Sequence, residues 1–163
     1  MTTRFLEGWG RNLGTKAITL NFQDFNKSCL NYSEAIAFGK NRSYGDSSFN
    51  SNGICVDMSS VNHIQVDPIS RIAICGAGCT VEELESAALN HGLFPAVVPG
   101  TSKITIGGAI ASNVHGKSHH KYGCFGDHVK EFKILTSTNG IVTAKPDGKN
   151  SDLFHATLGG MGL

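Results

Sequence analysis

The residues with the clearest capacity for chemistry in this 163-residue sequence lie in a glycine-rich stretch without acidic side chains. Residues 86–125 contain no aspartate or glutamate, although the chain holds 13 of them, and they include Lys103, Lys117 and Lys121. The same stretch holds six glycines, whose backbone N–H groups are not shielded by a Cβ atom. Such N–H groups, far from negative charge, suit an anion such as a pyrophosphate. The sequence therefore favours ligand contact here, above all over residues 99–116.

One phosphate-binding motif, the dinucleotide fingerprint, is suggested by Gly76 and Gly78, which follow a predicted strand and precede a predicted helix. The fingerprint needs a third glycine where Val81 stands, and an acidic residue about 20 positions further on. Both are missing, because the later position falls in the stretch without acidic side chains. We therefore reject this motif.

A second alternative is a phosphate loop over residues 111–118 (ASNVHGKS), which departs from the pattern Gly-x-x-x-x-Gly-Lys-Ser only at Ala111. Such a loop must follow a strand and precede a helix, and residues 118–123 have no apolar helical face. A nucleoside triphosphatase is therefore disfavoured. A non-catalytic phosphate-binding module that relies on Lys117 stays open as an alternative.

A third alternative is a metal site built from His115, His119 and His120, with Cys124 nearby. The spacing of His115 and His119 would align two imidazoles on a helix. No aspartate or glutamate is close in sequence to orient them, and adjacent histidines point apart. We favour histidines that form hydrogen bonds or face a phosphate, and we predict no metal site.

Helices and strand pairs are predicted on both sides of this stretch. The clearest helix begins after Thr80, which can form a capping box with Glu83, and ends at Gly92. A hairpin turn is indicated by residues 137–140 (STNG). The predicted helices cover residues 22–30, 80–92 and 151–160, and the predicted strands cover residues 34–38, 54–58, 62–66, 71–75, 129–136 and 141–144. This mixture predicts an α+β fold.

Composition fits one folded domain. The chain is 40% apolar and 17% charged with a net charge of +1, which argues against general disorder and against a nucleic-acid partner. Its longest uncharged run, residues 86–102, is broken by prolines and polar residues, and residues 1–7 lack the apolar core of a signal peptide. The cysteines are odd in number and are expected to be free thiols; they are Cys29, Cys55, Cys75, Cys79 and Cys124.

Five motifs in order resemble the FAD-binding (PCMH-type) domain of the vanillyl-alcohol-oxidase-like flavoproteins, most of all the decaprenylphosphoryl-β-D-ribose 2-oxidase family. The motifs are residues 42–46 (RSYGD), 98–101 (VPGT), 105–111 (TIGGAIA), 114–117 (VHGK) and 125–129 (FGDHV). The resemblance implies a fold of two small α/β subdomains. It also implies an FAD-binding domain over residues 1–163 that is incomplete at its C-terminal end, with the substrate domain absent from this chain.

The resemblance implies two loops that hold FAD. The residues of the first are Gly39, Lys40, Asn41, Arg42, Ser43, Tyr44, Gly45 and Asp46, and those of the second are Pro99, Gly100, Thr101, Thr105, Ile106, Gly107, Gly108, Ser112, Asn113, His115 and Gly116. It places Tyr44 and His115 beside the flavin and the substrate as catalytic residues, and Lys117 near a phosphate. Some relatives attach FAD to a histidine where Asp46 stands here, so we expect non-covalent FAD.

The activity implied by the resemblance is oxidation of a secondary hydroxyl of a sugar, a lipid-linked pentose used in cell wall biosynthesis. A partner reductase would complete an epimerisation, and the protein would be cytoplasmic or associated with the inner face of the cell envelope. An alternative is an FAD-dependent alditol or aldonolactone oxidase. Because the substrate domain is expected to be absent, we expect this chain alone to bind FAD weakly and not to turn over.

Overall fold

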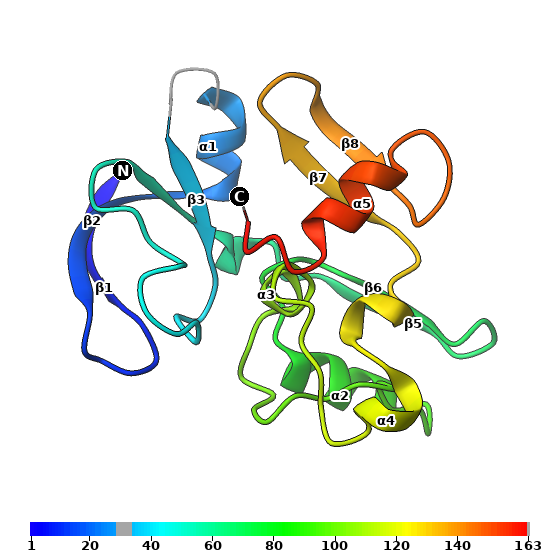
Figure 1. The fold of residues 1–163 in the computed structure, drawn as a ribbon. Helices are drawn as coiled ribbons and strands as arrows, with labels where there is room; N and C mark the ends of the chain where they lie inside the picture. Colours follow the sequence, from blue (N-terminus) through cyan, green and yellow to red (C-terminus); the bar gives the residue numbers. More distant parts are fainter. Residues whose placement is uncertain (29–33, 163) are drawn as a thin grey trace.

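The computed structural model describes residues 1–28 and 34–162, and its N-terminal part is a four-stranded sheet (Figure 1). The strands lie in the order β1 (Thr2–Glu7), β2 (Gly14–Asn21), β4 (Ile54–Asp57) and β3 (Ala35–Phe38). Strand β1 pairs antiparallel with β2, whereas β2 and β3 both pair parallel with β4. The most buried strand, β4, therefore lies inside the sheet, as its apolar sequence predicts.

Side chains alternate between the two faces of this sheet and build a small core on each. One face gathers buried residues of all four strands, namely Leu6, Ala17, Phe38 and Cys55. The other face gathers Leu20, Ile54 and Val56, and it is covered by helix α1 (Phe22–Ser28) through Phe22 and Phe25. The last residue of β3, Phe38, places its side chain on the first of these faces, and residues 39–46 follow directly.

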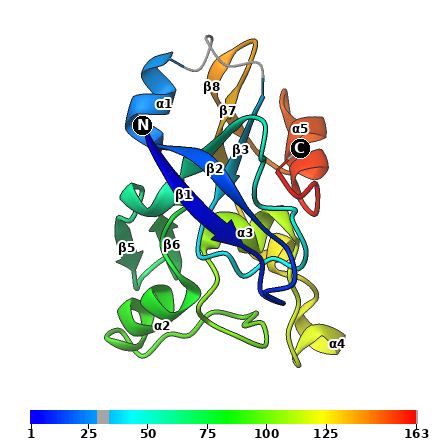
Figure 2. The same ribbon diagram turned by 90° about the vertical axis from the view of Figure 1, so that its left-hand side faces the viewer.

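The middle of the chain forms a third core, which includes residues of two helices. Strands β5 (Ile64–Asp67) and β6 (Ile72–Cys75) form an antiparallel hairpin, and helices α2 (Val81–Leu89) and α3 (Ile106–Ala111) follow. This core is built on Cys79, Val81 and Ile106, which are buried. Figures 1 and 2 both place α3 near the centre of the molecule, between the N-terminal sheet and the rest of the chain.

The last part of the chain packs a helix on a hairpin. After helix α4 (His119–Tyr122) and the 3-10 helix η3 (Phe125–His128), strands β7 (Phe132–Thr136) and β8 (Gly140–Ala144) pair antiparallel. Helix α5 (Ser151–Thr157) anchors to the hairpin by Phe154, which is buried and stacks on Phe132 with ring centroids 5.0 Å apart. A short 3-10 helix, η2 (Met58–Ser60), completes the set.

The predicted α+β class is confirmed, as are the strands, the two later hairpins and the capped helix. The first helix is confirmed over Phe22–Ser28, while Cys29 and Leu30 lie outside the described residues. The sequence did not indicate β1, β2, α3 or α4. Strand β1 is mostly exposed and α3 carries two glycines, so neither has the apolar pattern on which the prediction relied. Cys55, Cys75, Cys79 and Cys124 are free thiols, as expected.

No helix among the described residues has the length and apolar character needed to cross a membrane.

Candidate functional site

Two loops that lie far apart in the sequence meet at one point. We call residues 39–46 the first loop and residues 99–116 the second loop; the second includes helix α3. A Cβ atom on Gly39 would lie 2.5 Å from the hydroxyl oxygen of Thr105, the residue directly before α3. Only glycine permits this approach, so the structure brings the two predicted groups of site residues together.

The first loop presents a row of free backbone donors. Among the residues that the structure describes, none accepts a hydrogen bond from any backbone N–H of residues 40–46. Asn41 and Gly45 adopt left-handed backbone conformations, with φ of 52° and 63°. Left-handed residues reverse the course of the backbone, and backbone N–H groups in such turns can bind anions. Lys40 and Arg42 add positive charge, so this loop is suited to a phosphate group.

The side chain of Asn41 adds an unpaired acceptor to the first loop. Its Oδ1 atom is buried and has no hydrogen-bond partner, and the same holds for the hydroxyl of Ser48 shortly after the loop. A buried polar atom without a partner costs about 1–3 kcal/mol. Such an atom leaves an acceptor available to a bound molecule.

The turn between β1 and β2 holds the first loop from outside. The backbone N–H of Trp9 donates to the carbonyl of Ser43 at 2.9 Å, and the Arg42 guanidinium lies 4.7 Å from the centre of the Trp9 ring. A Cβ atom on Gly8 would collide with the carbonyl of Gly45. The sequence analysis assigned no role to this turn; the signal was the single tryptophan of the chain, flanked by glycines.

The backbone N–H groups at the N-terminal end of α3 donate hydrogen bonds to other groups of the protein. The hydroxyl of Thr105 accepts the Gly108 N–H at 3.2 Å, and the N–H groups of Ile106 and Gly107 donate to the carbonyls of Cys79 and Ala77 at 2.7 and 2.9 Å. These amides are therefore not free to bind an anion, which differs from what we expected of Gly107 and Gly108. The missing side chain of Gly107 instead allows close packing on Ala77, 3.1 Å from a Cβ atom placed there.

The beginning of the second loop is more open. Gly100 is exposed, and no atom lies within 4 Å of a Cβ atom built on it. The half-buried Thr101 accepts the Lys103 N–H through its hydroxyl at 3.3 Å, and Pro99 is also half-buried. Gly100 is therefore a position where a bound molecule could approach the backbone.

The end of the second loop turns back along residues 96–98. Asn113 adopts a left-handed conformation with φ of 42°, and its Oδ1 accepts the Gly126 N–H at 3.0 Å. Gly116 passes so close to the carbonyl of Val98 that a Cβ atom would collide with it. Ser112 is exposed and ends α3. The Asn113 side chain therefore joins this loop to η3.

The two predicted catalytic side chains are both exposed. Tyr44 is 80% exposed, and the His115 ring is tilted against that of His119 with centroids 5.1 Å apart. His119 in turn lies 3.7 Å from the sulfur of Cys124 through its Nδ1. Within residues 1–28 and 34–162, no three histidine, cysteine, aspartate or glutamate side chains are grouped to hold a metal ion.

The alternative phosphate motifs lack their structural context. Residues 111–118 follow helix α3 instead of a strand, and the helix after them has only four residues, so they do not form a phosphate loop. Gly76 and Gly78 pack against backbone, because Cβ atoms there would collide with the carbonyls of Val61 and Met58. These two glycines flank Ala77, whose carbonyl accepts the Gly107 N–H of α3.

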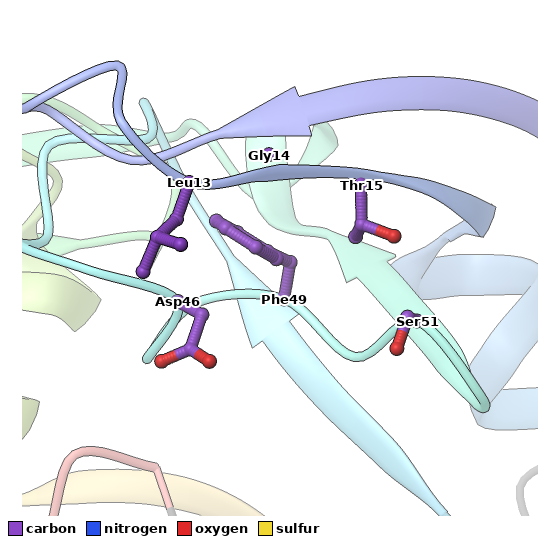
Figure 3. Close-up of a pocket in the computed structure, with 6 residues that line it drawn as sticks. All are labelled: Leu13, Gly14, Thr15, Asp46, Phe49 and Ser51. Atoms are coloured by element: carbon purple, nitrogen blue, oxygen red, sulfur yellow. The ribbon is translucent and has the colours of Figure 1, made fainter.

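Two hollows adjoin the loops. The smaller, of about 160 Å³, is lined by Asp46 together with Leu13, Gly14, Thr15, Phe49 and Ser51 (Figure 3). The larger, of about 540 Å³, is lined by Lys117 and Ser118 together with Phe94, Pro95, Ala96, Val98 and Tyr122. Asp46 borders the smaller hollow with its carboxylate directed away from the start of β2 (Figure 3), while Lys117 borders the larger hollow, which is lined mainly by apolar side chains.

Electrostatic coupling also joins the first loop to α2. Hydrogen bonds from the backbone and the hydroxyl of Thr80 lower the pKa of Glu83, and the positive charge of Lys40 adds to this effect. The same hydrogen bonds form the capping box of α2 that the sequence predicts. Lys40 therefore lies near the N-terminal end of α2, beside the meeting point of the two loops.

A family model described as "FAD binding domain" matches residues 21–145 of this chain. A decaprenylphosphoryl-beta-D-ribose oxidase of Mycolicibacterium smegmatis is 41% identical over 99% of this chain and 37% of its own length. A D-lactate dehydrogenase of Archaeoglobus fulgidus is 34% identical over 68% of this chain and 26% of its own length.

Among solved structures, a 6-hydroxy-D-nicotine oxidase of Arthrobacter nicotinovorans matches with a TM-score of 0.68 and 24% identity, over 77% of this chain and 27% of that one. This likeness shows a shared fold. The chain spans well under half the length of each of these relatives, since the largest share covered is 37%.

Proposed function

This chain belongs to the family of FAD-binding domains, and from that premise we propose that it binds FAD non-covalently where the first and second loops meet. The observation that carries this proposal is the row of free backbone N–H groups over residues 40–46, next to the contact between Gly39 and Thr105. The residues present fit the coenzyme, because a diphosphate needs several donors, and Lys40 and Arg42 offset the one carboxylate of the first loop, Asp46.

In this proposal the first loop holds the diphosphate. Its backbone N–H groups and the hydroxyl of Ser43 donate to phosphate oxygens, while Lys40 and Arg42 balance the charge. The second loop forms the opposite side, with Gly100 as an open approach to the backbone. Asp46 cannot form the covalent bond that a histidine would, so the coenzyme stays dissociable.

We propose further that the whole protein is an oxidoreductase that oxidises a secondary hydroxyl of a sugar, a lipid-linked pentose. The 41% identical relative, named a decaprenylphosphoryl-beta-D-ribose oxidase, supports this substrate class. When bound, FAD supplies the hydride acceptor. His115 would hydrogen-bond the reacting hydroxyl and take up its proton, and Tyr44 would orient the sugar beside the flavin.

The remaining partners follow from this chemistry. Oxidation of the hydroxyl leaves a ketone, so a reductase that returns it to the opposite configuration would complete an epimerisation. A lipid-linked substrate would bring the protein to the inner face of the cell envelope. The apolar side chains beside Lys117 support a substrate that carries both a phosphate and an apolar part.

The test is the absorbance spectrum of the whole protein after purification. We expect flavin bands that leave the protein on acid precipitation, as non-covalent FAD requires, and reduction of those bands by a polyprenyl-phosphate-linked ribose. A colourless protein that takes up no added FAD would refute the coenzyme assignment. Reduction by an alditol, an aldonolactone or D-lactate instead of the lipid-linked sugar would keep FAD but refute the substrate.

A further inference from the structure

Asn41 has a side chain that the protein itself does not satisfy. Its Oδ1 atom is buried without a partner, one of two such side-chain atoms among the described residues. The other is in Ser48, seven positions later on the segment that continues the first loop. Both unsatisfied side-chain atoms of the described residues thus belong to the first loop or to the segment that directly follows it.

Comparison with a second asparagine, Asn113, shows that the left-handed backbone alone does not explain why an asparagine with an unpaired Oδ1 stands at position 41. Asn41 and Asn113 both adopt left-handed conformations, with φ of 52° and 42°. Asparagine tolerates this conformation, and glycine does so at least as well. The Oδ1 of Asn113 accepts the Gly126 N–H at 3.0 Å, whereas that of Asn41 accepts nothing. The carboxamide of Asn41 is therefore a burden of about 1–3 kcal/mol unless a bound molecule donates to it.

In the orientation of the Asn41 carboxamide, the missing partner of its buried oxygen is a hydrogen-bond donor. A carboxamide oxygen only accepts, and a diphosphate at neutral pH has no hydrogen to donate. The hydroxyl groups of the ribityl chain and of the ribose lie on either side of the diphosphate in FAD, and they can donate. Resting on the proposed function, we propose that Asn41 Oδ1 accepts a hydrogen bond from such a hydroxyl. This contact would distinguish the coenzyme from a simple diphosphate.

The experiment compares Asn41→Gly with the unaltered protein, because glycine keeps the left-handed backbone and removes only the carboxamide. FAD affinity is measured by flavin fluorescence titration of the apoprotein, and inorganic pyrophosphate is measured as a competitor. We expect FAD affinity to fall about tenfold, as the loss of one such hydrogen bond implies, with pyrophosphate competition unchanged. Unchanged FAD affinity, or equal losses for both ligands, would overturn the inference.

Two further measurements separate this role from a structural one. Arg71→Gly is the matched control, because Arg71 has φ of 56° in the exposed turn between β5 and β6, and it should leave FAD affinity unchanged. The apoprotein of Asn41→Gly should unfold at the same or a higher temperature, since the Oδ1 that it loses has no hydrogen-bond partner in the protein. A lower unfolding temperature, or a failure to fold, would show a structural role and overturn the inference.

The design also separates this inference from the proposed function. Unaltered protein that takes up no FAD would refute both. Unaltered protein that binds FAD, together with an Asn41→Gly variant of the same affinity, would refute only the role of the carboxamide.

Discussion

The first and second loops both carry glycines and both belong to the candidate site, yet they use their backbone in opposite ways. In the first loop, the N–H groups of residues 40–46 have no acceptor among the described residues. In the second, the N–H groups of Ile106, Gly107 and Gly108 all donate within the protein. The first loop therefore leaves its amides available to a ligand, whereas this part of the second loop uses its amides for hydrogen bonds within the protein.

The glycines of the two loops differ for the same reason. Gly39 allows the two loops to touch, and Gly107 allows α3 to pack on Ala77. Gly45 supplies a left-handed turn, with open space around it. The two loops are both rich in glycine, but their glycines have different structural roles. Substitutions at these positions should therefore have different effects.

The largest effect is expected from Gly39→Val. A Cβ atom there meets both the hydroxyl and the methyl group of Thr105, at 2.5 and 2.6 Å, and Thr105 is buried with little freedom to rotate. We expect FAD binding to be lost and the free energy of unfolding to fall by about 3 kcal/mol, measured by urea denaturation. Gly100→Val, where a Cβ atom meets nothing, should leave the free energy of unfolding unchanged. Equal losses in the two variants would mean that the loops do not meet at Gly39.

A smaller effect is expected from Thr105→Val, which keeps the shape of the side chain and removes the hydroxyl that caps α3. The Gly108 N–H then loses its acceptor, so the free energy of unfolding should fall by about 1 kcal/mol. Thermal or urea unfolding of the apoprotein checks this. Thr105→Ser keeps the cap and serves as the control. A stability change that appears only when FAD is bound would instead show that the hydroxyl serves the ligand.

Trp9→Ala tests whether the turn between β1 and β2 positions the first loop. Removal of the ring ends its contact with the Arg42 guanidinium, 4.7 Å from the ring centre, but keeps the backbone bond to Ser43. A cation–π contact at an exposed site is worth about 0.5–1 kcal/mol, so we expect FAD to bind about threefold more weakly. Trp9→Phe should retain most of the affinity in the same fluorescence titration. If the two variants are alike, the ring does not position the loop.

Local sequence patterns predicted much of the fold but less of the candidate site. The capping box of Thr80 and Glu83 and the STNG turn were readable because each acts within a few residues. Helix α3 was not, since its two glycines disfavour a helix and contacts with Ala77 and Cys79, distant from it in sequence, hold it. For the same reason, the sequence could group the site residues by resemblance but could not tell that the Gly107 amide is already bonded.

The smallest effect, absent at neutral pH, concerns Cys75, a residue of β6 that packs against the same core as Ile106 of the second loop. Burial raises the pKa of the Cys75 thiol to about 11, and the neighbouring Cys79 adds to the shift. The ordinary value is 9.0, so the folded state disfavours the thiolate. The thiol's contribution to stability is therefore complete below pH 9.0 and is lost as pH rises through about 11.

Unfolding by urea under reducing conditions, measured between pH 8 and 11 as the range that brackets this shift, tests the effect. The free energy of unfolding should fall with rising pH in the unaltered protein and fall less in Cys75→Ala. Cys75 lies in the core that also holds Ile106, so an alkaline loss of stability should loosen the second loop first. Hydrogen exchange would then rise at the amides of Ile106 and Gly107 before the N-terminal sheet opens. Simultaneous opening of both regions would show that the two loops do not differ in their support.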